Sequence, residues 1–126
     1  MDELPPLEPY LLRAFYEWCV DNEFTPQILV VVEEQDTNVQ VPIAYVHQGK
    51  IALNISPTAC GNLQMTNEYV SFSARFAGVE EAIWIPVGNI IAIYARENGA
   101  HIPFELRRVP ENKEKQETIS PIFTKV

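Results

Sequence analysis

The sequence predicts a mostly β domain with one N-terminal helix, an α+β arrangement in which a strongly bent antiparallel sheet or a small barrel follows the helix. Three observations lead to this prediction. A helical pattern fills residues 10–22, six short runs rich in β-branched and aromatic residues lie between residues 27 and 95, and turn residues separate several of those runs. The length of 126 residues and the apolar fraction of 47% fit one compact domain.

The predicted helix covers residues 10–22, which include neither glycine nor proline. Pro9 suits the first helical position, and Glu8 suits the positive end of the helix dipole. Residues three or four apart share a face, and here they form two adjacent apolar stripes. Because one stripe can face the domain's own core and the other a second copy of the chain, we expect a homodimer. Its predicted interface consists of Leu11, Leu12, Phe15, Tyr16, Trp18 and Cys19.

Six segments have the composition and length of β-strands. They occupy residues 27–33, 39–46, 50–55, 68–76, 82–86 and 89–95. Turn residues follow three of them, at Gly49, Gly78 and Gly99. No internal repeat is visible, so we expect six short strands of one sheet or barrel behind the helix.

A stretch of small and polar residues, 56–67, lies between the third and fourth predicted strands. It is either a plain connecting loop or one wall of a groove, because Ala59, Cys60 and Gly61 have little bulk and let another backbone approach closely. On the strand that follows, side chains alternate between two faces. That alternation places Phe72, Ala74 and Phe76 on one face, and Ser71, Ser73 and Arg75 on the other.

Charge is unevenly distributed along the chain. Residues 1–106 hold four cations against 14 acidic residues, a net charge of −10, whereas residues 107–126 carry +2. A body with four cations cannot neutralise several phosphates, which argues against nucleic acid and against anionic membrane surfaces as partners. Arg75 is one of those four cations. It either belongs to a surface ion pair or engages a polar or acidic ligand side chain.

The sequence contains no catalytic residue types at the spacing of a known catalytic motif. His47 and His101 lack partners at a recognisable spacing, and Cys19 and Cys60 lie far apart without a CxxC pattern. We therefore predict no enzyme activity, no cofactor and no metal. The acidic start of the chain and the absence of a long apolar run favour a cytoplasmic protein. Binding of an extended peptide along a sheet edge or groove is the remaining function that suits a small β domain.

Several stretches together resemble the SspB family, stringent starvation protein B, the specificity-enhancing factor of the ClpXP protease. The similar stretches are 9–18 (PYLLRAFYEW), 21–22 (DN), 25–26 (TP), 41–42 (VP), 53–56 (LNIS), 61–63 (GNL), 74–76 (ARF) and 91–99 (IAIYARENG). The resemblance implies a helix followed by an Sm-like bent sheet, a homodimer formed through the helix, and no enzyme activity. It also implies that the chain binds the ssrA degradation tag and tethers tagged proteins to the ClpX unfoldase.

The resemblance divides the chain into a tag-binding, dimerising domain over residues 1–106 and a flexible tail over residues 107–126. It places the peptide groove at Ser56, Ala59, Gly61, Asn62, Phe72, Ala74, Arg75 and Phe76. The tail departs from the family's longer acidic linker and its basic-apolar end, and keeps a proline, an apolar pair and a lysine. The residues expected to bind ClpX are Ile122, Phe123, Lys125 and Val126.

Two other functions compete with binding of the ssrA tag. An RNA-binding module is disfavoured by the net charge of −10 on residues 1–106. A dimeric module that binds some other extended peptide, without tethering to ClpX, remains the alternative.

Overall fold

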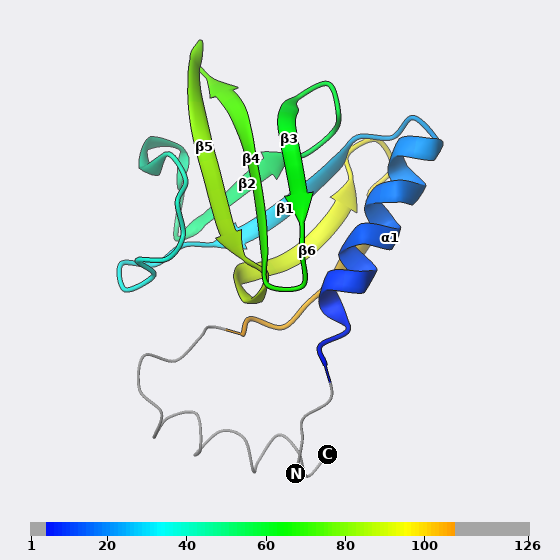
Figure 1. Cartoon of the computed structure of the whole chain (residues 1–126), viewed down its shortest axis with the longest axis horizontal. Helices are drawn as coiled ribbons and strands as arrows, with labels where there is room; N and C mark the ends of the chain where they lie inside the picture. Colours follow the sequence, from blue (N-terminus) through cyan, green and yellow to red (C-terminus); the bar gives the residue numbers. More distant parts are fainter. Residues whose placement is uncertain (1–4, 108–126) are drawn as a thin grey trace, which may run out of the picture.

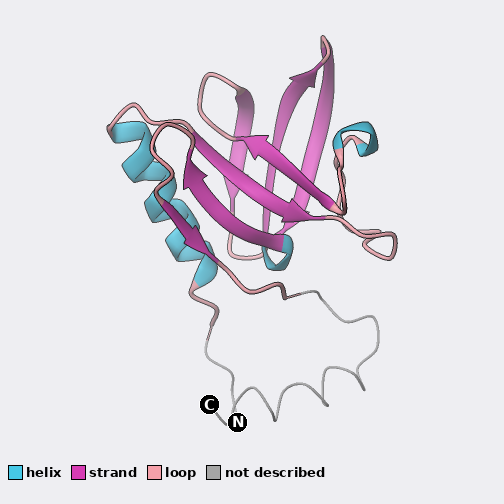
Figure 2. Ribbon diagram, turned by 180° about the vertical axis from the view of Figure 1, so that it is seen from behind, coloured by secondary structure: helices cyan, strands magenta, loops and turns pink. Residues whose placement is uncertain are grey.

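The computed structural model describes residues 5–107, and in them one helix precedes seven strands that form two antiparallel sheets (Figures 1 and 2). The elements are α1 (Glu8–Asp21), β1 (Pro26–Val31), η1 (Ile43–Tyr45), β2 (Lys50–Asn54), β3 (Cys60–Met65), β4 (Tyr69–Phe76), β5 (Val79–Pro86), η2 (Val87–Asn89), β6 (Ile90–Ala95) and β7 (His101–Pro103). The predicted α+β fold is thus confirmed. Within the described residues the strands stay in two separate sheets and do not close a barrel.

The first sheet has the strand order β2-β1-β6-β7 and the second the order β3-β4-β5. They lie one in front of the other, and the β4–β5 hairpin extends beyond the first sheet at the top of Figure 1. The core lies between the sheets, where β1 contributes Ile28 and Val30 and β4 contributes Val70 and Phe72. These residues sit two apart on their strands, so each pair points to the same side.

Helix α1 lies beside the first sheet, along β6 and β1 (Figure 2). It begins at Glu8 with Pro9 in its first turn, in agreement with the sequence prediction. No helix in residues 5–107 combines the length and the apolar character that crossing a bilayer requires.

Residues 39–46 do not form the predicted strand. Only Gln40 makes a β-bridge, to Trp84 of β5, and the helical turn η1 then occupies Ile43–Tyr45. Pro42 explains the difference, because proline has no N–H to donate to a strand ladder. The β-branched composition of the segment was therefore misleading.

Two strands were missed in the sequence. β3 lies in the stretch expected to be a loop, since its ladder to β4 is made by backbone groups and its small and polar side chains carry no β signal. β7 is only three residues long and ends in Pro103, yet it pairs with β6 at the edge of the first sheet. Edge strands tolerate proline, which removes the usual argument against a strand there.

The start of β1 is held to the end of β6 by Thr25 and Glu97. The Thr25 backbone N–H and hydroxyl donate to the two Glu97 carboxylate oxygens over 2.7 and 2.5 Å. The Arg96 N–H donates to the Thr25 carbonyl over 3.0 Å, directly beyond the Pro26–Ala95 pair of the ladder. The side-chain and backbone hydrogen bonds from Thr25 lower the pKa of Glu97.

The hydrogen bonds between Thr25 and Glu97, which we call the Glu97 clamp, predict that a small part of the free energy of unfolding is lost at acid pH. Because the pKa of Glu97 is lower in the folded chain than in the unfolded one, its stabilising effect is present above the unfolded carboxyl pKa of about 4.3 and is lost as pH falls through the folded value. Glu97→Gln should reduce the dependence of the free energy of unfolding on pH below about pH 4.5. Urea titrations at several pH values measure this, with Glu105→Gln as the control; identical pH profiles for Glu97→Gln and the wild type would contradict it.

Candidate functional site

The chain passes from one sheet to the other through a tight turn at Ser56. The Ser56 carbonyl accepts hydrogen bonds from the N–H groups of Ala59 and Cys60, over 3.0 and 3.2 Å. The Ser56 N–H donates to the Asn54 side-chain oxygen over 2.9 Å, and the residue is buried. Ser56 therefore fixes where β3 begins, while Ala59 remains half-exposed on the turn.

The turn leads directly to the pairing of β3 with β4, in which Cys60 lies opposite Ala74 and Gly61 opposite Ser73. The register then shifts between Gly61 and Gln64, and Asn62 adopts a φ of 58° in this bulge. Asparagine tolerates this left-handed conformation better than most residues. The bulge leaves Gly61 and Asn62 exposed next to the half-buried Cys60 and Ala74.

Strand β4 separates the predicted peptide-binding residues between its two faces. Phe72 is only 5% exposed and belongs to the core, whereas Ala74 and Phe76, on the same side, are half-buried. Arg75 points to the opposite side, is exposed, and donates to the Gly78 carbonyl over 3.4 Å. The structure thus places Ala74 and Phe76 on one side of the second sheet, with Cys60 opposite Ala74, and Arg75 on the other side. Ala59 lies on the Ser56 turn, directly before β3.

Beside Phe76 lies a group of exposed apolar side chains that the sequence did not indicate. The Tyr45 ring is centred 5.1 Å from the Phe76 ring, and Val79 lies opposite Phe76 in the β4–β5 ladder. Ile43, two residues before Tyr45, is 70% exposed. We call Ile43, Tyr45, Phe76 and Val79 the apolar cluster. Pro42 is a sequence signal for the helical turn Ile43–Tyr45 that follows it, but the contact of Tyr45 with Phe76 has no signal in the sequence.

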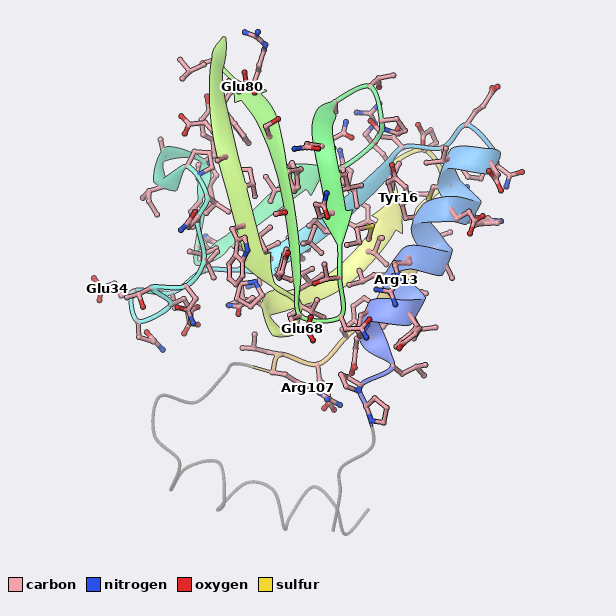
Figure 3. The ribbon with its side chains drawn as sticks, viewed as in Figure 1. Arg13, Tyr16, Glu34, Glu68, Glu80 and Arg107 are labelled. Atoms are coloured by element: carbon pink, nitrogen blue, oxygen red, sulfur yellow. The ribbon has the colours of Figure 1, made fainter. Side chains whose placement is uncertain are left out.

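Cys60 and Tyr16 face each other between β3 and α1. Burial raises the pKa of the Cys60 thiol, which donates to the Ser56 carbonyl over 3.5 Å. Burial and the nearby Cys60 raise the pKa of Tyr16, a residue of α1 marked in Figure 3. Neither shift produces the activated thiolate that covalent chemistry needs. Within residues 5–107, His, Cys, Asp and Glu side chains form no group of three or more that could hold a metal ion.

The predicted dimer residues of α1 divide between two environments. Leu12 and Cys19 are at most 1% exposed and pack inside their own domain. The dimer interface itself stays a prediction. Leu11, Phe15 and Tyr16 are half-buried, and Trp18 is exposed.

The outward side of the helix carries an exposed apolar stripe that shares only Trp18 with the predicted interface. Leu7, Tyr10, Ala14 and Trp18 are all exposed and follow one another at intervals of three or four residues. That spacing places them on one side of a helix. We call these four residues the helix stripe.

Arg13 ties α1 to the end of β3. Its guanidinium donates to the Met65 carbonyl over 3.0 Å and to the Asn67 side-chain oxygen over 2.9 Å, and it lies 4.6 Å from the centre of the Tyr10 ring (Figure 3). Arg13 thereby supports the outer edge of β3, on the side away from β4. Hydrogen bonds from Arg13 therefore fix α1, which carries the helix stripe, against the end of β3, the strand that follows the Ser56 turn.

The amino-acid sequence matches a known protein family. The family model described as stringent starvation protein B, SspB, matches residues 6–122. The chain belongs to the SspB family. A stringent starvation protein B homolog of Haemophilus influenzae is 53% identical to it over 100 residues, which are 79% of this chain and 65% of the relative. The predicted SspB membership is therefore confirmed, and the chain spans slightly less than two thirds of that relative's length.

The residues predicted to contact ClpX, Ile122, Phe123, Lys125 and Val126, lie outside the described residues. Their assignment stays a prediction. The last described residue, Arg107, donates its N–H to the Gly88 carbonyl over 2.7 Å and therefore lies beside η2.

Proposed function

We propose that this chain is a non-enzymatic, cytoplasmic adaptor that binds the ssrA degradation tag and delivers tagged proteins to the ClpXP protease. Membership of the SspB family carries the proposal. The geometry adds a surface suited to an extended peptide, formed by the Ser56 turn, the β3 bulge and the half-exposed side of β4.

Small side chains make this surface accessible to another backbone. Ala59, Gly61 and Ala74 leave main-chain groups near the exposed bulge, and an extended peptide gains affinity from such groups by hydrogen bonding. Phe76 and Tyr45 continue the surface as an apolar wall at which a ligand side chain can be recognised. Asn62 offers an exposed amide at the opposite end.

Dimerisation is the second part of the proposal, and it uses the helix stripe instead of the interface predicted from the sequence. Leu7, Tyr10, Ala14 and Trp18 form a continuous exposed apolar side of α1. Ala14 at its middle leaves room for a second helix to approach closely. Two copies joined in this way would present two tag surfaces and two tails.

Delivery is the third part. A tail that binds ClpX would raise the local concentration of tagged substrate at the unfoldase, an effect that reaches the millimolar range for short flexible connections. Residues 119–126 combine apolar and basic character and are the part of the tail proposed to make this contact.

Ala59→Phe should weaken tag binding by at least tenfold, or about 1.4 kcal/mol, because a ring on the Ser56 turn would occupy the space of the peptide. Arg75→Gln should have a smaller effect, since Arg75 lies on the side of β4 opposite to Ala74 and Phe76. Fluorescence anisotropy with a labelled ssrA peptide and a scrambled peptide measures both. Ala82→Phe is the matched control, because Ala82 is exposed on β5 opposite Ser73. Unchanged affinity in both test variants would place the peptide elsewhere, and equal affinity for the scrambled peptide would favour a generic peptide-binding module.

Ala14→Glu should convert a dimer into a monomer at micromolar concentration, because it places a charge in the middle of the apolar helix stripe. Sedimentation velocity measures the change. Ala52→Glu is the control, since Ala52 is exposed on β2 in the first sheet. A wild-type chain that is monomeric at these concentrations would exclude the proposed dimer.

Deletion of residues 119–126 should abolish accelerated degradation of an ssrA-tagged reporter by ClpXP while tag binding persists. The reason is that the described domain contains the whole proposed tag surface and none of the proposed ClpX contact. Reporter fluorescence is followed with the full chain, with the deletion and with no added chain. Undiminished acceleration by the deletion would show that these residues are not the tether.

A further inference from the structure

Three of the four side chains of the apolar cluster are exposed to solvent. Ile43, Tyr45 and Val79 are 70%, 41% and 58% exposed, and they are three of the seven large apolar side chains that are exposed in the described part of the chain. The Phe76 ring contacts the Tyr45 ring, and Val79 lies opposite Phe76 at the end of the β4–β5 hairpin. Ile43 is on the same helical turn as Tyr45. Grouped apolar side chains on a surface mark a site of interaction.

One segment of the same chain has the chemistry that suits this cluster. Residues 119–126 hold Ile119, Ile122 and Phe123 together with Lys125. Near the cluster, Glu81 lies opposite Ala74, on the side of the sheet that carries Phe76. Glu80, marked at the hairpin end in Figure 3, lies opposite Arg75 on the other side. The net charge is −10 over residues 1–106 and +2 over residues 107–126, so the long-range electrostatic attraction has the right sign.

The chain between Arg107 and Ile119 is long enough for residues 119–126 to contact the apolar cluster of the same molecule. The Arg107 backbone N–H donates a hydrogen bond to the carbonyl of Gly88, just beyond the end of β5. The Arg107 guanidinium lies 3.2 Å from the Glu8 carboxylate. From there the span along β5 to Val79 is about 23 Å, at a rise of about 3.3 Å per residue. The connection from Arg107 to Ile119 can extend to about 40 Å at its limit of roughly 3.4 Å per residue.

We propose that residues 119–126 bind the apolar cluster of their own chain. Phe76 belongs both to the cluster and to the side of β4 that carries Ala74, so a bound tail overlaps the proposed tag surface. The tail then competes with the tag and holds the adaptor in a self-occupied state until either a tag or the tail's partner displaces it. The competition, though not the contact itself, rests on the proposed function.

The contact is tested first without any tag, on the full chain with Phe123→Ser. Amide NMR shifts of residues 43–46 and 76–79 should change relative to the wild type, by an amount independent of protein concentration. Ile43→Ser should produce reciprocal changes in residues 119–126, whereas Leu7→Ser, equally exposed but on α1, should produce none there. Absence of these changes overturns the proposal, and changes that grow with protein concentration overturn it in favour of contact between two copies.

The competition is tested by tag affinity in the same variants. At an effective concentration of about 1 mM, a tail that binds with a Kd of about 0.1–1 mM weakens tag binding roughly two- to tenfold. Phe123→Ser should therefore tighten tag binding by that factor, and Thr118→Ser should not. Equal tag affinity of Phe123→Ser and wild type overturns the competition. Failure of every variant to bind the tag would contradict the proposed function, while the NMR shifts would still report the contact.

Discussion

At Ser56 the chain leaves the first sheet and enters the second, and the geometry of the proposed tag surface is set there. The Ser56 carbonyl accepts hydrogen bonds from the N–H groups of Ala59 and Cys60. These bonds fix the start of β3, where Cys60 lies opposite Ala74. A buried carbonyl with two donors is costly to disrupt, because any other arrangement leaves polar groups unpaired inside the protein. The small residues that follow can stay exposed without loss of order, since backbone bonds and not side-chain packing hold them in place.

The apolar arc of α1 is wide enough to pack against the domain and also to expose an apolar stripe to solvent, which a helix with a narrower apolar arc could not do. Leu12 and Cys19 close the core of the domain, and Leu7, Tyr10 and Trp18 leave an apolar side outward. The sequence showed that the apolar arc was too wide for one surface. It could not show which stripe faced inward, because both have helical spacing, and the division depends on where the first sheet lies relative to α1.

The fold class and the positions of five of the strands followed from patterns of β-branched residues and turns, which act locally. Errors arose where tertiary context decided the outcome. Pro42 overrode the β composition of residues 39–46, and backbone pairing to β4 made a strand of the small and polar residues of β3. Among the predicted site residues, simple alternation on β4 already separated Arg75 from Ala74. The apolar cluster could not be foreseen, since it depends on the Tyr45 ring meeting Phe76 across a distance in sequence of about 30 residues.

Family likeness here rests both on residues that build the fold and on residues of the proposed tag surface, since the similar stretches 53–56, 61–63 and 74–76 include Ser56, Gly61, Asn62 and Ala74. The stretch 91–99, one of the longest similar segments, supplies β6 and the Glu97 clamp on Thr25, so its chemistry explains the fold. The helix segment 9–18 supplies Arg13, which supports β3, and part of the helix stripe. The proposed tag surface depends on a shorter set, the Ser56 turn, the Gly61–Asn62 bulge and Ala74. Substitutions at Gly61 and Asn62 should change which peptide is bound more than they change the core, because these two residues are exposed, whereas Ser56 is buried and Ala74 packs against the core.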